Sequence, residues 1–179
     1  MNQYKEKYLD FTWVLAMINA MIEESIYHTD TFAHSLKVHH NDKAAKVFDR
    51  ICEQFKAEQN IVLNYTLNVD LPNIPPWEIP YTEYQHPASV LIDATYLMSE
   101  SEAWKLMNGM IEIHNNFYNF LFKENKEGDV INIVDQLIDY YNQCGQENKG
   151  HELKAETKQT ESLEDLDVIS LHSSEGGCW

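Results

Sequence analysis

The sequence has few of the residues that interrupt helices. It contains six glycines and five prolines in 179 residues, and the prolines lie mostly within residues 71–87. Proline removes a backbone donor and clashes inside a helix, so a helix through that segment is not expected. The near absence of both residues elsewhere predicts long uninterrupted helices on either side of it, as a helix bundle requires.

Positive charge is also scarce. The chain carries 13 Lys and Arg against 29 Asp and Glu, which gives a formal net charge of −16. Nucleic acids and anionic membrane surfaces attract concentrated Lys and Arg, so neither partner is expected for this chain. No apolar run approaches the roughly 20 residues of a transmembrane helix. Residues 1–10 also lack the apolar stretch of a signal peptide.

Cysteine is rare and shows no pairing pattern. The three cysteines, Cys52, Cys144 and Cys178, have no CxxC spacing. An odd number without a framework suits a reducing compartment, so a cytoplasmic location is expected. The length and a hydrophobic content of 44% predict one globular domain with a sizeable core.

Apolar residues recur at three- and four-residue spacing in four segments. These segments predict helices at about 11–37, 42–67, 88 or 99 to 123, and 129–144. Asn41 or Asp42 can cap the second helix, and Asp129 can cap the fourth. The proline-rich crossover between the second and third helices is long enough for two helical hairpins to run parallel. The sequence therefore predicts an all-α four-helix bundle of two helical hairpins with a long crossover.

The apolar pattern stops at Gly145. Residues 146–164 are rich in Lys, Glu, Gln and Thr, with Leu153 and Leu163 as their only large apolar side chains. So few apolar groups do not offset the roughly 1–2 kcal/mol lost per ordered residue. We predict a bundle over residues 1–144 and a disordered acidic tail over residues 145–179.

Three segments resemble rubrerythrin-related proteins of the ferritin-like superfamily, over about residues 15–144. Residues 38–41 (VHHN) resemble the Glu-x-His-Asn-Asn hairpin turn of that family. Residues 71–77 (LPNIPPW) resemble its Leu-Pro…Pro-Trp crossover. Residues 96–99 (YLMS), followed by residues 117–118 (FY), are similar to its Tyr-Leu-Met-Thr-Pro…Phe-Phe stretch. The resemblance implies a ferritin-like bundle, and in this family the bundle interior holds two iron atoms.

The resemblance also implies where iron ligands should lie. The first and third helices of such bundles each supply a Glu, and the second and fourth each supply Glu-x-x-His. Carried over by distance from the matching segments, the six positions are Ile22, Phe55, Glu58, Ile111, Val134 and Leu137. Five of them are apolar. The resemblance thus implies an erased di-iron site, no expected cofactor and no ordinary di-iron oxidase activity.

A register shift of one residue would restore some ligands. Glu23 and Glu112 follow Ile22 and Ile111, but at about 100° per residue they lie away from the apolar stripes and face water. The alternative function is a di-metal oxidase or peroxide reductase that binds iron through displaced ligands. Those ligands would be drawn from Glu23, Glu24, Glu58, Glu112 and His114.

Glu58 and His114 are the candidate metal-binding residues. Each falls within an apolar stripe, where an isolated charge costs several kcal/mol. They form a remnant mononuclear metal site, a proton-handling pair, or a hydrogen-bonded polar contact of purely structural character. We predict that both point into the bundle and interact. Glu24 and His28, four residues apart, are either a surface metal pair or part of a solvated helix face.

The end of the chain carries one short apolar motif. Residues 166–173 (LDVISLHS) resemble the C-terminal targeting peptide of encapsulin cargo proteins, Leu-Thr-Val-Gly-Ser-Leu-Arg. The matching stretch implies a shell protein as partner and a protein nanocompartment as location. An acidic tail with accidental apolar residues is the alternative. The residues expected to bind the partner are Leu166, Val168, Ile169, Ser170 and Leu171.

Together these features indicate a divergent rubrerythrin- or ferritin-like protein of iron or oxidative-stress handling. The expected role is a cargo or interaction subunit without the usual oxidase chemistry. A homodimer through a Met- and aromatic-rich side is a further expectation. A helix-bundle adaptor unrelated to iron, with a partner on the bundle instead of the tail, is the third reading.

Overall fold

The computed structural model describes residues 10–74, 85–125 and 128–173, with side chains described as far as Lys158 and for Thr160. Its regular structure in these ranges is wholly helical, without a strand, which confirms the all-α prediction. The elements are α2 (Phe11–Val38), α3 (Asp42–Thr66), the short 3₁₀ helix η2 (Pro87–Leu91), α4 (Glu100–Glu124) and α5 (Asp129–Ser173). A search of these helices finds none with the length and apolar character needed to cross a membrane.

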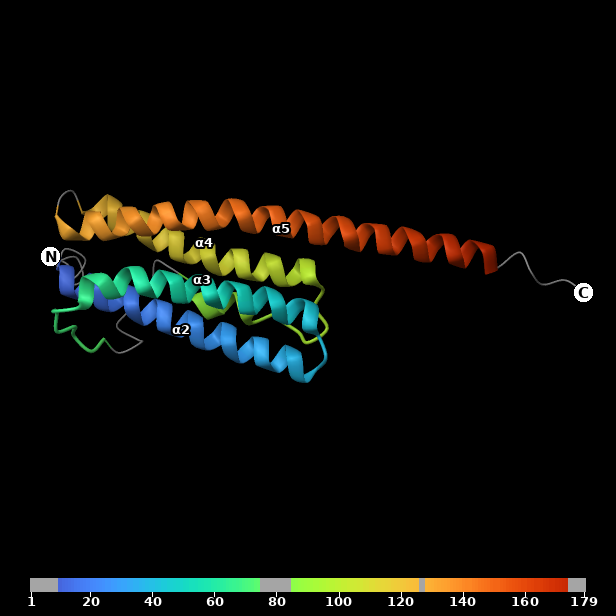
Figure 1. Ribbon diagram of the computed structural model, residues 1–179, viewed down its shortest axis with the longest axis horizontal. Helices are drawn as coiled ribbons and strands as arrows, with labels where there is room; N and C mark the ends of the chain where they lie inside the picture. Colours follow the sequence, from blue (N-terminus) through green and yellow to red (C-terminus); the bar gives the residue numbers. More distant parts are fainter. Residues whose placement is uncertain (1–9, 75–84, 126–127, 174–179) are drawn as a thin grey trace, which may run out of the picture.

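The helices form two hairpins that pack against each other (Figure 1). Helix α2 packs chiefly on α3, and α4 packs chiefly on α5, as predicted. Helices α3 and α4 run in the same direction, because the crossover returns the chain to the end of the bundle at which α3 began (Figure 1). Contacts between α3 and α4 join the two hairpins.

Polar side chains determine where the helices begin. Asn41 caps α3 by accepting from the backbone N–H of Ala44 at 3.3 Å. Its side-chain amide also donates to the carbonyl oxygens of Tyr96, at 2.9 Å, and Met98, at 2.8 Å. Ser99 then caps α4 in a reciprocal capping box with Glu102. One asparagine therefore holds the start of α3 beside the segment that leads into α4.

The core is built from the apolar stripes that the sequence predicts. Phe48, Ile51, Phe55 and Val62 follow one face of α3 at helical spacing, and all four are fully buried. Burying such a side chain stabilises the fold by about 1.5–3 kcal/mol relative to leaving it exposed. The core cluster takes buried residues from each of the four long helices. The bundle is held together by this shared core.

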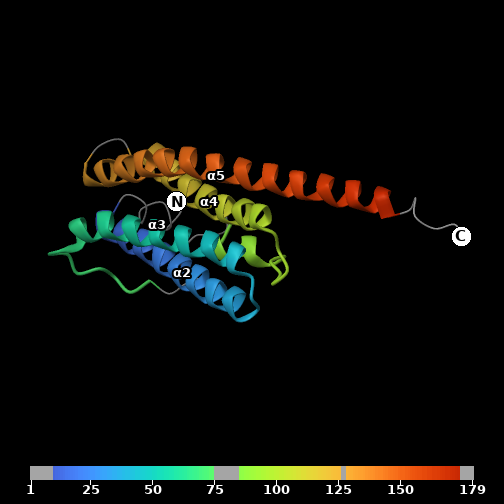
Figure 2. The same cartoon turned by 45° about the vertical axis from the view of Figure 1, so that its right-hand side comes forward.

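Helix α5 does not end near Cys144, so the predicted boundary of the bundle is wrong. From Asp129 to Ser173 it spans 45 residues, about 67 Å at 1.5 Å per residue, and it projects past the other helices (Figures 1 and 2). Fully buried Asn148 exchanges two hydrogen bonds with Gln54, of 3.1 and 2.9 Å. His151 stacks on Trp104 with 5.3 Å between ring centroids. Residues 145–158 are thus an ordered part of the bundle.

The continuation of α5 past Cys144 was not predicted because of the kind of side chains that pack there. The added turns of α5 pack through an amide, an imidazole and the small Ala155, and they lack a large apolar stripe. Hydrophobic periodicity does not detect contacts of that kind. Beyond Lys158 the backbone stays helical to Ser173, in place of the predicted disorder. The side chains of residues 166–171 lie outside the described part, so their binding role stays a prediction.

Candidate functional site

The centre of the bundle holds a carboxylate. Glu58 lies on the buried face of α3 between Phe55 and Val62, at the helical spacing of that stripe, and its exposed fraction is 0%. On α4, His114 and Tyr118 are spaced by one helical turn and are also 0% exposed. The predicted inward orientation of Glu58 and His114 is confirmed.

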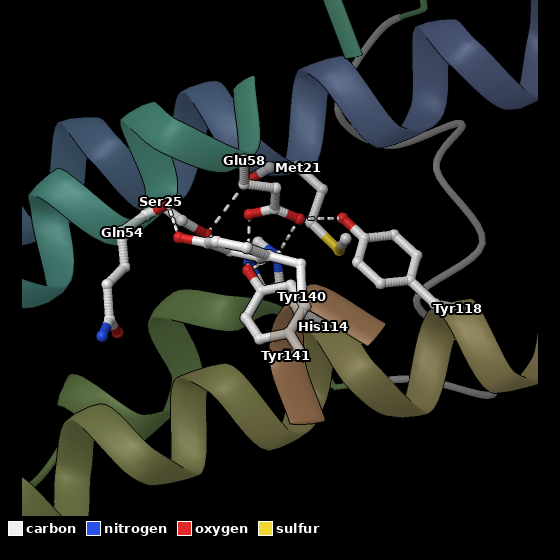
Figure 3. Close-up of polar contacts among 8 residues, drawn as sticks. All are labelled: Met21, Ser25, Gln54, Glu58, His114, Tyr118, Tyr140 and Tyr141. Carbon is white, nitrogen blue, oxygen red and sulfur yellow. Dashed lines mark hydrogen bonds and ion pairs between the residues drawn. The ribbon is translucent and has the colours of Figure 1, made fainter. Parts of the chain in front are cut away.

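Two tyrosine hydroxyls donate to this carboxylate (Figure 3). The Tyr118 hydroxyl donates to Glu58 Oε1. The Tyr141 hydroxyl, from α5, donates to Glu58 Oε2 at 2.5 Å. The His114 Nδ1 atom lies 3.3 Å from Oε1 and 3.1 Å from the Tyr141 oxygen. Each carboxylate oxygen therefore has at least one donor. The prediction that Glu58 and His114 lie close enough to interact, directly or through one water, is confirmed.

Helix α2 completes the network from the other side. The Ser25 hydroxyl lies 2.8 Å from His114 Nε2 and donates to the Met21 carbonyl at 2.9 Å (Figure 3). Toward Nε2 the Ser25 hydroxyl serves as acceptor or as donor, depending on the tautomer of the imidazole. Both tyrosine hydroxyls donate their hydrogens to Glu58. The contacts of His114 Nδ1 with Glu58 and with the Tyr141 oxygen are therefore hydrogen bonds only if Nδ1 carries a proton. Glu58 therefore faces an N–H group of His114 together with the two phenol hydroxyls.

Aromatic rings enclose the imidazole. The Phe55 ring stacks on the His114 ring, with centroids 4.8 Å apart and planes at 27°. The Tyr140 hydroxyl donates to the Gln54 carbonyl at 2.7 Å (Figure 3). Glu58 and His114 thus lie in a closed, aromatic-walled interior.

Burial also fixes the ionisation of the two donors. Burial raises the pKa of Tyr118 well above its ordinary value, and the charge and hydrogen bond of Glu58 raise it further. Burial, followed by the Glu58 charge, does the same to the pKa of Tyr141. Both phenols therefore stay neutral donors in the folded chain well above the pH at which an ordinary tyrosine ionises.

The apolar positions carried over from the resemblance also lie inside the bundle. Ile22, Phe55, Val134 and Leu137 are fully buried, and Ile111 is nearly so. Their predicted inward orientation is confirmed. None of these side chains can bind a hard metal ion, which takes oxygen and imidazole ligands. The residues present therefore do not fit a di-iron centre.

The displaced carboxylates lie on different surfaces. Glu23 and Glu112 are exposed, as their helical positions predict, and Glu23 accepts from the Asn19 amide at 3.0 Å. Glu24 pairs with His86 from the crossover, and the His28 ring meets His86 edge-on at 6.1 Å. None of these three carboxylates joins Glu58.

The described residues contain no group of three or more His, Cys, Asp or Glu placed to hold a metal ion. Glu58 and His114 together supply one oxygen-bearing group and one imidazole, already bonded to their neighbours. Their role as metal ligands stays a prediction.

Sequence reasoning missed three members of this network. They are Tyr118, Tyr141 and Ser25, which lie on the buried faces of α4, α5 and α2. Their shared signal is a hydroxyl at an inward position, since buried hydroxyls require partners. Tyr118, one turn after His114 and opposite an inward Glu, could have been identified on that basis.

Comparison of the chain with protein-family models, with curated proteins and with solved structures finds no match.

Proposed function

We propose that this chain is a divergent, rubrerythrin-like member of the ferritin-like superfamily that acts as a cargo or interaction subunit. In this proposal a hydrogen-bonded network takes the place of the di-iron centre. The observation that carries it is the fully buried Glu58 carboxylate, held by the hydroxyls of Tyr118 and Tyr141. The paired hairpins and long crossover are compatible with the ferritin-like arrangement, and iron or oxidative-stress handling is its proposed setting.

The network disfavours metal binding for an energetic reason. A metal ion at Glu58 would displace the hydrogen bonds from Tyr118 and Tyr141. Each buried hydroxyl left without a partner costs about 1–3 kcal/mol. Only His114 is at hand as a second ligand, whereas a pair of iron ions needs several carboxylates and imidazoles. The function is therefore assigned to surfaces of the protein instead of to redox chemistry in its interior.

Anaerobic titration with ferrous iron, followed by oxygen, tests this proposal. The unmodified protein is expected to give no saturating oxidation step, followed by absorbance and by iron retained after desalting. A matched variant restores the implied ligands through Ile22→Glu, Phe55→Glu, Glu58→His, Ile111→Glu, Val134→Glu and Leu137→His. If that variant folds, it should retain about two irons per chain, as two-iron ferritin-like bundles do. A step saturating at two irons in the unmodified chain would contradict the proposal.

The proposed partner is an encapsulin-type shell protein bound through residues 166–171, inside the cytoplasm. Many copies of a weak apolar motif in one assembly would bind through avidity. Because Asn148 and Ala155 are buried in the bundle, removal of the tail must begin after Thr160. That truncation removes the last helical residues of α5, so it should lower the helical circular dichroism only in proportion to their number and leave the thermal stability unchanged. It should abolish co-purification with a co-expressed shell protein.

A gain-of-function control completes this test. Residues 161–179 fused to an unrelated carrier should confer association with the shell. The same fusion with Leu166→Ser and Leu171→Ser should not. If the chain truncated after Thr160 still enters the shell as well as the full chain does, the tail is not the address and this part of the proposal fails.

A further inference from the structure

The end of α5 projects beyond the bundle (Figures 1 and 2). Near the end of the bundle, Ala155 is buried and Glu156 pairs with Lys105 of α4 at 3.0 Å. From residue 159 to Ser173 the helix continues past the ends of α2, α3 and α4, and residues 159–173 are called the extension below. Helices in proteins draw most of their stability from packing an apolar face, so the faces of the extension indicate what it packs against.

One face of the extension continues the face of α5 that packs into the bundle. That face includes the buried residues Asn148 and Ala155, and Ala155 gives its direction at the end of the bundle. At about 100° per residue, Leu163, Leu166 and Ile169 occupy positions within about 80° of that direction around the helix axis. Their spacing of three residues is that of an amphipathic helix. The apolar stripe of the bundle interface therefore continues in register into the extension.

The other faces of the extension are acidic. Residues 159–173 contain four carboxylates and no Lys or Arg. The positions of Glu161, Glu164, Asp165 and Asp167 are each at least about 100° from that of Leu166 around the axis. Asp165 and Asp167 fall on opposite sides of the apolar stripe. The extension is therefore an amphipathic helix whose narrow apolar stripe has an acidic residue along each edge.

The charge of the extension disfavours a second copy of this chain as the cover for the stripe. Two extensions side by side would bring together two sets of four carboxylates, without a Lys or Arg in either. Opposed like charges at an interface are unfavourable. The apolar stripe requires an apolar surface, and its acidic edges require positive charge. The complementary surface is thus an apolar groove, wide enough for one helix and rimmed by Lys or Arg.

We propose that the shell partner receives the extension as an intact helix, with Leu163, Leu166 and Ile169 in an apolar groove whose rims carry Lys or Arg. This inference rests on the proposed function, which assigns residues 166–171 to that partner, and adds the conformation that is recognised. It is carried by the helical backbone as far as Ser173 and by the continuity of the stripe with the bundle interface.

Helical and extended binding differ at Leu163. A helix presents anchors every three or four residues, whereas an extended peptide presents alternate residues. Leu163 lies outside the stretch 166–173 that resembles a targeting peptide, but it belongs to the helical stripe. Only a helical mode of binding therefore requires it.

Loading of the full chain into the co-expressed shell tests the mode of binding. Expression is held below saturation, and the chains retained per shell subunit are counted after size-exclusion chromatography. Leu163→Ser should lower loading about tenfold, the effect of removing one buried leucine from the groove. Leu153→Ser, at a leucine of α5 that is 64% exposed, is the matched control and should leave loading unchanged.

Two further sets of variants address the helix and the charge. Glu164→Pro should interrupt the helix and lower loading at least about tenfold, whereas Glu164→Ala keeps the helix and should load like the unmodified chain. Helical circular dichroism should fall only in Glu164→Pro, and the thermal stability of the bundle should change in neither. Asp165→Asn with Asp167→Asn should lower loading about threefold, because the attraction to the basic rims is lost.

These results separate the inference from the proposed function. If the unmodified chain does not load, both fail. If it loads, and Leu163→Ser and Glu164→Pro load equally well, the segment is bound in an extended form and only this inference fails. Higher loading of Asp165→Asn with Asp167→Asn overturns the basic rims. If sedimentation shows that Leu163→Ser dissociates a dimer of the free chain, a second copy covers the stripe and the inference is overturned.

Discussion

Glu58→Ala is expected to lower the free energy of unfolding by about 3–5 kcal/mol, the cost of breaking a buried charge pair from one side. The substitution leaves the hydroxyls of Tyr118 and Tyr141 without acceptors and the His114 ring without its carboxylate partner. Urea unfolding followed by circular dichroism measures the change. Glu53→Ala, an exposed site on the same helix, is the control and should change the stability by less than about 0.5 kcal/mol.

Finer substitutions separate charge from hydrogen bonding. Glu58→Gln keeps one acceptor oxygen but presents an amide donor to the other hydroxyl, so a loss of about 1–3 kcal/mol is expected. In a double-mutant cycle, Glu58→Gln and Tyr141→Phe should couple by more than 0.5 kcal/mol, since the two groups touch. A loss below about 1 kcal/mol for Glu58→Ala would show that the carboxylate is solvated, contrary to its burial.

The stability is expected to fall steeply above about pH 10, the ordinary pKa of tyrosine. The pKa values of Tyr118 and Tyr141 are raised in the folded chain, because burial disfavours the phenolate and Glu58 repels it. In the unfolded chain both phenols lose their protons near pH 10, while in the folded chain they keep them. The unfolded state then binds fewer protons, so each tyrosine removes about 1.4 kcal/mol per pH unit as the pH rises. Below pH 10 their contribution is fully present.

Urea unfolding between pH 8 and 11.5, with tyrosinate absorbance recorded in parallel, tests this. The tyrosinate absorbance of Tyr118 and Tyr141, and of the half-buried Tyr140, whose pKa burial also raises, should develop only as the chain unfolds. Tyr27→Phe serves as the control, because Tyr27 is 66% exposed and should leave the slope unchanged. If all tyrosines ionise near pH 10 while the helices remain intact, the buried network is wrongly described.

The sequence predicted those features that depend on neighbouring residues of the chain. The apolar period of α3 placed Phe55 and Glu58 on one inward face, and the same period placed Glu23 and Glu112 in solvent. Asn41 was predicted as a possible cap because a capping side chain bonds backbone groups two or three residues away. The proline-rich crossover was recognisable because proline constrains its own backbone. Each of these features depends on residues within one short segment of the sequence.

The tertiary structure decided which of these faces meet and at what register. Whether Tyr118 and Tyr141 fill space or donate to Glu58 depends on how α3, α4 and α5 are positioned along their axes relative to one another. No local sequence pattern specifies this. The continuation of α5 past Cys144 rests on contacts such as Asn148 with Gln54, 94 residues apart in the chain. Local composition predicts disorder there, and the polar partner supplied by a distant helix stabilises the helix instead. Sequence thus determined the elements and their buried faces, and long-range packing determined the site.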